Sequence, residues 1–156
     1  MPDLPELPEP YFIRINGARC KGASEYVLEP SGDKVLLQPK DSAAKAQRWS
    51  VIPVFGEHMH WSGIAFVNVS DKRALMNAGY KKGLTTKPWE ETRPDQACAW
   101  QIRASKDHNH PGESSIASAL DDCFIDQGNH DECNGAVVIT YSWEGNNNQY
   151  WIVERA

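Results

Sequence analysis

The sequence is short of positive charge and has no long apolar run. It contains 16 Lys and Arg against 21 Asp and Glu, a formal net charge of −5, and its one basic cluster is Lys81-Lys82. A nucleic-acid partner is therefore not expected on electrostatic grounds. A membrane-spanning helix needs about 20 mostly apolar residues, so no span is expected either. With 156 residues, 40% hydrophobic and 24% charged, the chain suits a single globular domain.

Motifs for catalysis and for metal binding are also missing. The sequence has no Gly-x-Ser-x-Gly motif, no phosphate-binding loop and no pair of cysteines at CxxC spacing. Two pairs, His58 with His60 and His108 with His110, have a spacing that places both rings on one face of a strand. Both pairs lie in polar, turn-rich segments, as does His130, and zinc needs three or four converging ligands. We expect solvated loop histidines, no metal, no cofactor and no enzyme activity.

The cysteines and the first ten residues bear on the cellular compartment. Residues 1–10 form an acidic, Pro-rich leader that lacks the basic and apolar regions of a secretory signal. This predicts a location in the cytoplasm and nucleus, where the four cysteines should be free thiols. Their even number leaves a disulfide open, and Cys123 and Cys133, on either side of a predicted hairpin turn, are the candidate pair.

Three tryptophans recur at a fixed spacing. Trp49, Trp100 and Trp151 are 51 residues apart, since 100 − 49 = 51 and 151 − 100 = 51, and a glutamine precedes each within four residues. Such a period indicates a repeated supersecondary unit. We expect the three tryptophans to occupy equivalent places in the core rather than to contact a ligand.

Each repeat contains short apolar or alternating runs separated by turn residues. These runs, together with the strand after each tryptophan, predict about four strands per repeat and no helix. The fold class is therefore all-β, with repeats at about 11–54, 55–104 and 105–156. Three such units can close into a small barrel with a hairpin cap, a β-trefoil, and closure removes free sheet edges. A linear solenoid is the alternative, but it would need capping repeats.

Candidate binding residues gather in the third repeat. Asp126 and Tyr141 end two predicted strands that a hairpin around Asn134-Gly135 brings together. Asn148 and Gln149 follow in the next loop, and Trp143 is a second candidate aromatic. Carboxylates and amides bind hydroxyl groups, and an aromatic ring covers the apolar face of a sugar. We therefore expect a shallow, weak carbohydrate site, although Asp and Asn also favour turns for structural reasons.

At these residues the chain resembles the ricin-B-type lectins, whose repeats combine a strand-ending Asp, an aromatic and an Asn-Gln pair before the closing tryptophan. Over about 26–153 it is similar to the Euonymus-type lectins, with Gln47-Arg-Trp49, Ala65-Phe-Val-Asn68 and Asn148-Gln149-Tyr-Trp151 carrying the likeness. The resemblance implies a plant β-trefoil lectin that binds galactose- or mannose-type glycans without catalysis, resides in the cytoplasm and nucleus, and acts in stress responses.

The other repeats offer poorer sets. The second has Asn77, Trp89, Asp95 and Gln96 as a possible second site, with an amide at the strand end in place of an acid. The first has Glu29, but the proline Pro39 stands where an aromatic is expected. In the third repeat, Asp121 or Asp122 is the alternative carboxylate, because the loop after Asp126 is shorter than in the Euonymus-type family. One good site is therefore predicted.

Two functions compete with sugar binding. A β-trefoil protease inhibitor would present a rigid exposed loop, for which 87–90 and 106–112 are candidates. A structural interaction module would use the Pro-rich leader. The oligomeric state stays open, with a homodimer as one option, and it matters because one weak site per chain crosslinks cells only when chains associate.

Overall fold

The protein is built from short antiparallel strands, as a computed structural model describes for residues 9–15, 25–128 and 133–156. Each third of the chain contributes four of the twelve strands in these residues. The first third forms β1 (Pro10–Ile15), β2 (Tyr26–Ser31), β3 (Lys34–Pro39) and β4 (Trp49–Phe55). The second forms β5 (Ser62–Asn68), β6 (Arg73–Met76), β7 (Thr85–Pro88) and β8 (Trp100–Ala104). The third forms β9 (Ser114–Ser118), β10 (Phe124–Asp126), β11 (Ile139–Tyr141) and β12 (Ile152–Arg155).

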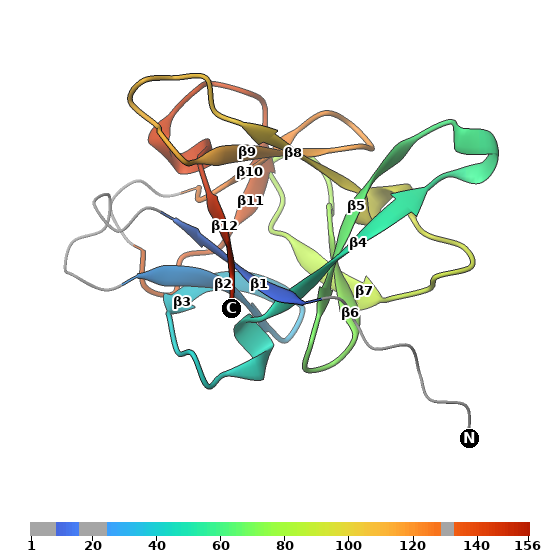
Figure 1. Cartoon of the computed structure of the whole chain (residues 1–156), viewed down its shortest axis with the longest axis horizontal. Coiled ribbons are helices and arrows are strands. Elements are labelled where there is room, and N and C mark those ends of the chain that lie inside the picture. Colours follow the sequence, from blue (N-terminus) through green and yellow to red (C-terminus); the bar gives the residue numbers. More distant parts are fainter. Residues whose placement is uncertain (1–8, 16–24, 129–132) are drawn as a thin grey trace.

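Six strands form a barrel, the first and fourth of each repeat. They pair in the order β12, β1, β4, β5, β8 and β9 (Figure 1). The ring closes at Ser114 and Trp151, which exchange two backbone hydrogen bonds of 2.8 Å next to β9 and β12. Closure leaves no free edge for another chain to pair with.

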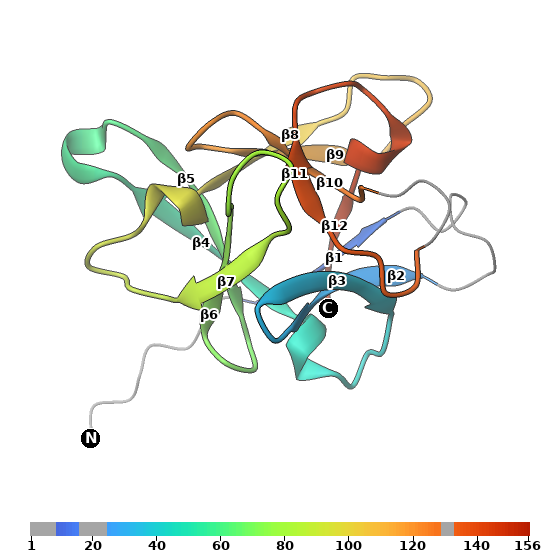
Figure 2. The same ribbon diagram turned by 180° about the vertical axis from the view of Figure 1, so that it is seen from behind.

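The second and third strands of each repeat form a hairpin, and the three hairpins cap one end of the barrel. The hairpins are β2–β3, β6–β7 and β10–β11. Backbone bridges from Leu36 to Val137 and from Gly83 to Ile139 join them, and Figure 2 shows β3, β7 and β11 on the same face of the molecule. This architecture is the β-trefoil, and the predicted fold class is confirmed.

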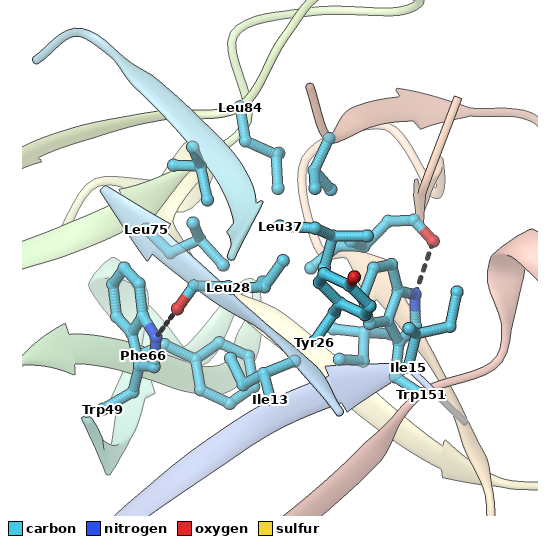
Figure 3. Packing of buried hydrophobic residues seen from close by; sticks show 14 of the residues in the cluster. Ile13, Ile15, Tyr26, Leu28, Leu37, Trp49, Phe66, Leu75, Leu84 and Trp151 are labelled. Atoms are coloured by element: carbon cyan, nitrogen blue, oxygen red, sulfur yellow. Dashed lines mark hydrogen bonds between the residues drawn. The ribbon is translucent and has the colours of Figure 1, made fainter. Parts of the chain in front are cut away.

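The three tryptophans hold equivalent places in the core. Trp49, Trp100 and Trp151 are each fully buried, within one cluster that also contains Phe66 and Ile125. Each indole N–H donates to a carbonyl within its hairpin's first strand: Leu28 at 3.2 Å, Leu75 at 3.0 Å and Ile125 at 2.9 Å. Figure 3 shows two of these bonds, from Trp49 and from Trp151. The bonds fix which residues correspond between repeats.

A single 3₁₀ turn precedes each tryptophan: η2 (Lys45–Gln47), η4 (Gln96–Cys98) and η5 (Asn147–Gln149). Gln47 and Gln149 end the first and third turns, two residues before the tryptophan, but Cys98 holds that place in the second. Gln96 is therefore not the counterpart of the other two glutamines. Burial raises the pKa of the Cys98 thiol to about 12, so it stays protonated and fills space.

The cysteine predictions are wrong in two respects. Cys98 and Cys123 are free, whereas Cys133 is disulfide-bonded, so neither four free thiols nor a pair of Cys123 with Cys133 is found. Cys123 lies half-buried after the β9–β10 turn, while Cys133 is buried in the main core cluster. Cys20, His130 and residues 1–8 of the leader lie outside the described residues.

Candidate functional site

A hollow of about 240 Å³ opens where the β10–β11 hairpin ends. Strand pairing places Asp126 opposite Ile139 and Phe124 opposite Tyr141, and side chains two residues apart on a strand share a face. The segment after β11 returns to the same place. The hollow is lined by Asp126, Gly128, Ile139, Tyr141, Glu144, Asn146 and Asn148.

Asp126 is held in one orientation at the floor of this hollow. Its side chain is buried, with 6% of its surface exposed, and Oδ1 accepts the Gly128 N–H at 2.7 Å. The side chains of Asn148 and Gln149 also hydrogen-bond to it. Burial raises the pKa of the Asp126 carboxyl, and these three bonds offset part of the rise. The carboxylate is thus a preorganised acceptor for hydroxyl groups.

Gln149 supports the hollow through hydrogen bonds and is not one of its lining residues. It is fully buried, and its Nε2 donates to the Ser142 carbonyl at 2.7 Å. Its Oε1 accepts the N–H groups of Glu144 at 2.8 Å and Gly145 at 3.1 Å. Gln149 therefore fixes both Asp126 and the loop that follows β11.

The amide and second carboxylate come from the loop and turn before Trp151. Turn η5 places Asn148 in the hollow, and the Asn148 carbonyl accepts the Gln127 N–H at 3.0 Å. Asn146 donates to the Glu144 carboxylate at 2.7 Å. Sequence reasoning missed Glu144 and Asn146, and the run of three asparagines at 146–148 was the available signal.

The aromatic residue at the hollow is Tyr141. It is half-exposed, and a hydrogen bond with Tyr80 raises its pKa. Trp143 instead packs against Phe124, with ring centroids 4.8 Å apart, and against Tyr150 at 5.5 Å. Of the two predicted aromatics, Tyr141 is the one that lines the hollow.

The alternative carboxylates lie at another turn. Asp121 accepts the Cys123 N–H at 3.0 Å, and Asp122 pairs with Arg103 at 3.1 Å. Both precede β10, whereas Asp126 ends it. The structure therefore favours Asp126 as the carboxylate of this site.

The second-repeat residues serve the fold. Asn77 is buried, donates to Ser118 at 2.9 Å and accepts the Gly79 N–H at 2.9 Å. Matching the indole bonds and strand registers puts Met76 at the place of Asp126 and Lys87 at that of Tyr141, so Asn77 was wrongly taken for the strand-end residue. By the same register Trp89 corresponds to Trp143.

The remaining two members of that set are also engaged in the fold. Asp95 caps η4 through the Ala97 N–H and pairs with Lys87, both at 2.9 Å. Gln96 donates to the Ala119 carbonyl at 2.9 Å, and Trp89 packs against the smaller core cluster. Each of the four thus makes contacts that stabilise the fold.

The first repeat keeps the acid but not its partners. Glu29 corresponds to Asp126, because each follows the residue whose carbonyl accepts the indole bond. The registers place Gln38, not Pro39, at the position of Tyr141, which corrects the sequence assignment. Ala46 stands where Asn148 stands in the third repeat.

The histidine and inhibitor-loop expectations change in part. His110 is buried, bonds Glu113 at 2.9 Å and stacks on Tyr150 with centroids 3.7 Å apart, so it is not a solvated loop histidine. It also anchors the candidate loop 106–112. In the loop 87–90, Lys87 and Pro88 belong to strand β7.

A larger hollow, of about 700 Å³, lies elsewhere, lined by Phe55, Gly56, Glu57, Thr92, Arg93 and Pro94. Glu57 there has a side chain 90% exposed, so binding would have to pay for ordering it. In the third-repeat hollow, by contrast, Asp126 and Asn148 are buried and hydrogen-bonded to each other. The third-repeat hollow is therefore the better candidate.

Within the described ranges, no three His, Cys, Asp or Glu side chains gather closely enough to hold a metal ion. In the same parts of the chain, no helix has the length and apolar character needed to cross a membrane.

No protein-family model matches the sequence, and no curated protein matches it. Solved structures with the same fold include three informative neighbours. A ricin B-like lectin of Macrolepiota procera in complex with lactose has a TM-score of 0.66 and 18% identity, covering 98% of this chain and 99% of that one. The C-terminal half of an earthworm R-type lectin in complex with GalNAc has a TM-score of 0.61 and 19% identity, covering 96% and 100%.

The third neighbour is an exo-β-1,3-galactanase from Clostridium thermocellum, with a TM-score of 0.70 and 20% identity. All of this chain matches 31% of that one. The neighbours are therefore ricin B-like β-trefoils that stand alone or form part of longer chains. At these identities the likeness shows the fold alone.

Proposed function

We propose that this protein is a non-catalytic lectin that binds a galactose-type sugar in the hollow of the third repeat. One observation carries the proposal: a buried carboxylate, an amide and an aromatic ring, from Asp126, Asn148 and Tyr141, line one shallow hollow. Asp126 and Asn148 would hold sugar hydroxyls, and Tyr141 would cover the apolar face of the ring.

Binding is favoured over catalysis by how the carboxylate is used. Asp126 is committed to a backbone amide and to two side-chain amides, an arrangement that orients an acceptor. A galactose-type ligand is favoured because the ricin B-like and earthworm neighbours were solved with lactose and GalNAc, and lactose ends in galactose. Mannose-type glycans are the second choice.

Membership of the Euonymus-type family, a role in plant stress and a cytoplasmic and nuclear location remain predictions. The disulfide at Cys133 bears on the last of these, because disulfides persist mainly in oxidising compartments. Microscopy of the tagged full chain tests the predicted location. Fluorescence found only in the secretory pathway would exclude the cytoplasm and nucleus.

A glycan array compares the parent with Asp126→Ala and Asp121→Ala. We expect the parent to bind galactose-terminated glycans, Asp126→Ala to lose them and Asp121→Ala to keep them, since Asp121 lies at another turn. If only Asp121→Ala lost glycan binding, the site carboxylate would be Asp121 and not Asp126. If the folded parent bound no glycan on the array, the lectin proposal would be wrong, and protease inhibition would be the next function to test.

A further inference from the structure

A loop of the second repeat lies against the third-repeat site. Residues 77–84 connect β6 to β7 and run beside β11, as the light-green loop next to β11 in Figure 2 shows. The Lys81 N–H donates to the Thr140 carbonyl at 2.8 Å, and the Thr140 N–H donates to the Lys82 carbonyl at 3.2 Å. The Thr140 hydroxyl also donates to the Gly79 carbonyl at 2.7 Å. The loop is thereby fixed relative to the hollow.

This loop adds an aromatic ring and a cation to the rim. Tyr80 is 49% exposed, and its ring centroid lies 5.4 Å from that of Tyr141. The Lys81 ammonium lies 5.3 Å from the Tyr80 centroid and 5.5 Å from the Tyr141 centroid. Tyr141 therefore belongs both to the hollow and to a cluster that extends beyond it.

The backbone of Lys81 is held in an uncommon conformation. Its φ is +63°, in the left-handed region that a long side chain rarely adopts. The corresponding turn of the first repeat needs only Gly32 and Asp33 between β2 and β3. That first-repeat turn uses a glycine in the left-handed region, Gly32 with φ +61°, whereas the second-repeat loop places a long side chain there.

Charge separates the two parts of the surface. The hollow carries the carboxylates of Asp126 and Glu144, while Lys81 is not among its lining residues and has its ammonium near the Tyr80 and Tyr141 rings. Among the described residues, no carboxylate forms a salt bridge with Lys81. An anionic group would be repelled inside the hollow but could pair with the ammonium beside it.

On the premise of the proposed function, we infer that Tyr80 and Lys81 form a second subsite. It takes an acidic group carried by the sugar in the hollow, either a further acidic sugar linked to it or a sulfate ester on it. The exposed Tyr80 ring packs on that sugar, and the Lys81 ammonium pairs with the anion.

The test is calorimetric titration of lactose, 3′-sialyllactose and 3′-sulfolactose into the parent, Lys81→Met, Lys82→Met and Asp126→Ala. Lys82 is the matched control, since it is exposed, adjacent and loses the same charge. We expect the parent to bind at least one acidic form about fivefold tighter than lactose, the size of one exposed ion pair. Lys81→Met should reduce that ratio to about one, and Lys82→Met should preserve it. The acidic form that binds identifies the source of the anion.

Two results overturn the subsite: equal affinity of the parent for lactose and both acidic sugars, or equal effects of the two lysine variants. Added salt should weaken the acidic sugars more than lactose. The proposed function fails separately, if Asp126→Ala binds lactose as the parent does. Thermal unfolding of each variant checks that it folds.

Discussion

The first and third repeats share a scaffold but not a surface. Each has a buried tryptophan whose indole N–H donates to a carbonyl of the hairpin's first strand, and a buried glutamine two residues earlier that bonds the backbone. The residues at three matched positions differ: Glu29, Gln38 and Ala46 in the first repeat, and Asp126, Tyr141 and Asn148 in the third. The repeated residues make the fold, and of these two repeats only the third places a carboxylate, an aromatic ring and an amide at the matched positions.

The largest loss of stability should be similar in all three repeats. We expect Trp49→Ala, Trp100→Ala and Trp151→Ala each to lower the free energy of unfolding by about 3–5 kcal/mol, because each removes a fully buried indole. Urea unfolding measures this. A small loss in any one of the three would break the equivalence between repeats.

The two glutamines should separate stability from binding. Gln47→Ala and Gln149→Ala each leave buried backbone groups unpaired, at a cost of about 1–3 kcal/mol in unfolding free energy. Only Gln149→Ala should also abolish lactose binding, because it releases Asp126 and the loop around Glu144. If Gln47→Ala lost binding equally, the effect would be global.

Replacing Tyr141 should lower the affinity for lactose without destabilising the fold. Tyr141→Gln gives the third repeat the residue that the first has at the same register. We expect lactose affinity to fall about fivefold through the lost ring contact, with the unfolding temperature nearly unchanged. If calorimetry gave the same lactose affinity as the parent, Tyr141 would not contact the sugar.

Two acids should respond to pH in opposite directions. The bond from Lys87 and that from the Ala97 N–H lower the pKa of Asp95, so its stabilising contribution is present above the ordinary Asp pKa and is lost as the pH falls. Burial raises the pKa of Asp126, so the folded chain favours its protonated form, and that contribution is lost as the pH rises.

At pH 7 we therefore expect Asp95→Asn to unfold at a lower temperature than the parent, and Asp126→Asn at the same temperature or a higher one. The deficit of Asp95→Asn should shrink below about pH 4. Thermal unfolding across this range checks both, and the same sign for the two variants would contradict the assignment.

The fold followed from sequence because its determinants are local and repeated. The period of Trp49, Trp100 and Trp151 and the turn residues between apolar runs were enough to predict a β-trefoil. The residue correspondence between repeats was harder, because hairpins of different length shift it. Asn77 was therefore taken for the strand-end residue when Met76 holds that place.

The positions of Tyr80 and Lys81 beside the site could not be predicted from the sequence. Tyr80 and Lys81 lie about 60 residues before Tyr141 in the sequence, and only the pairing of the second-repeat loop with β11 brings them together. Likewise, the burial of His110 depends on stacking against Tyr150, which lies about 40 residues later in the chain.

A lactose titration followed by amide NMR tests whether the third repeat alone binds the sugar. We expect shifts at the amides of Gly128, Tyr141 and Asn148, which line the hollow with the Asp126 carboxylate. Shifts grouped near Glu29 or Met76, with the third repeat unchanged, would contradict it.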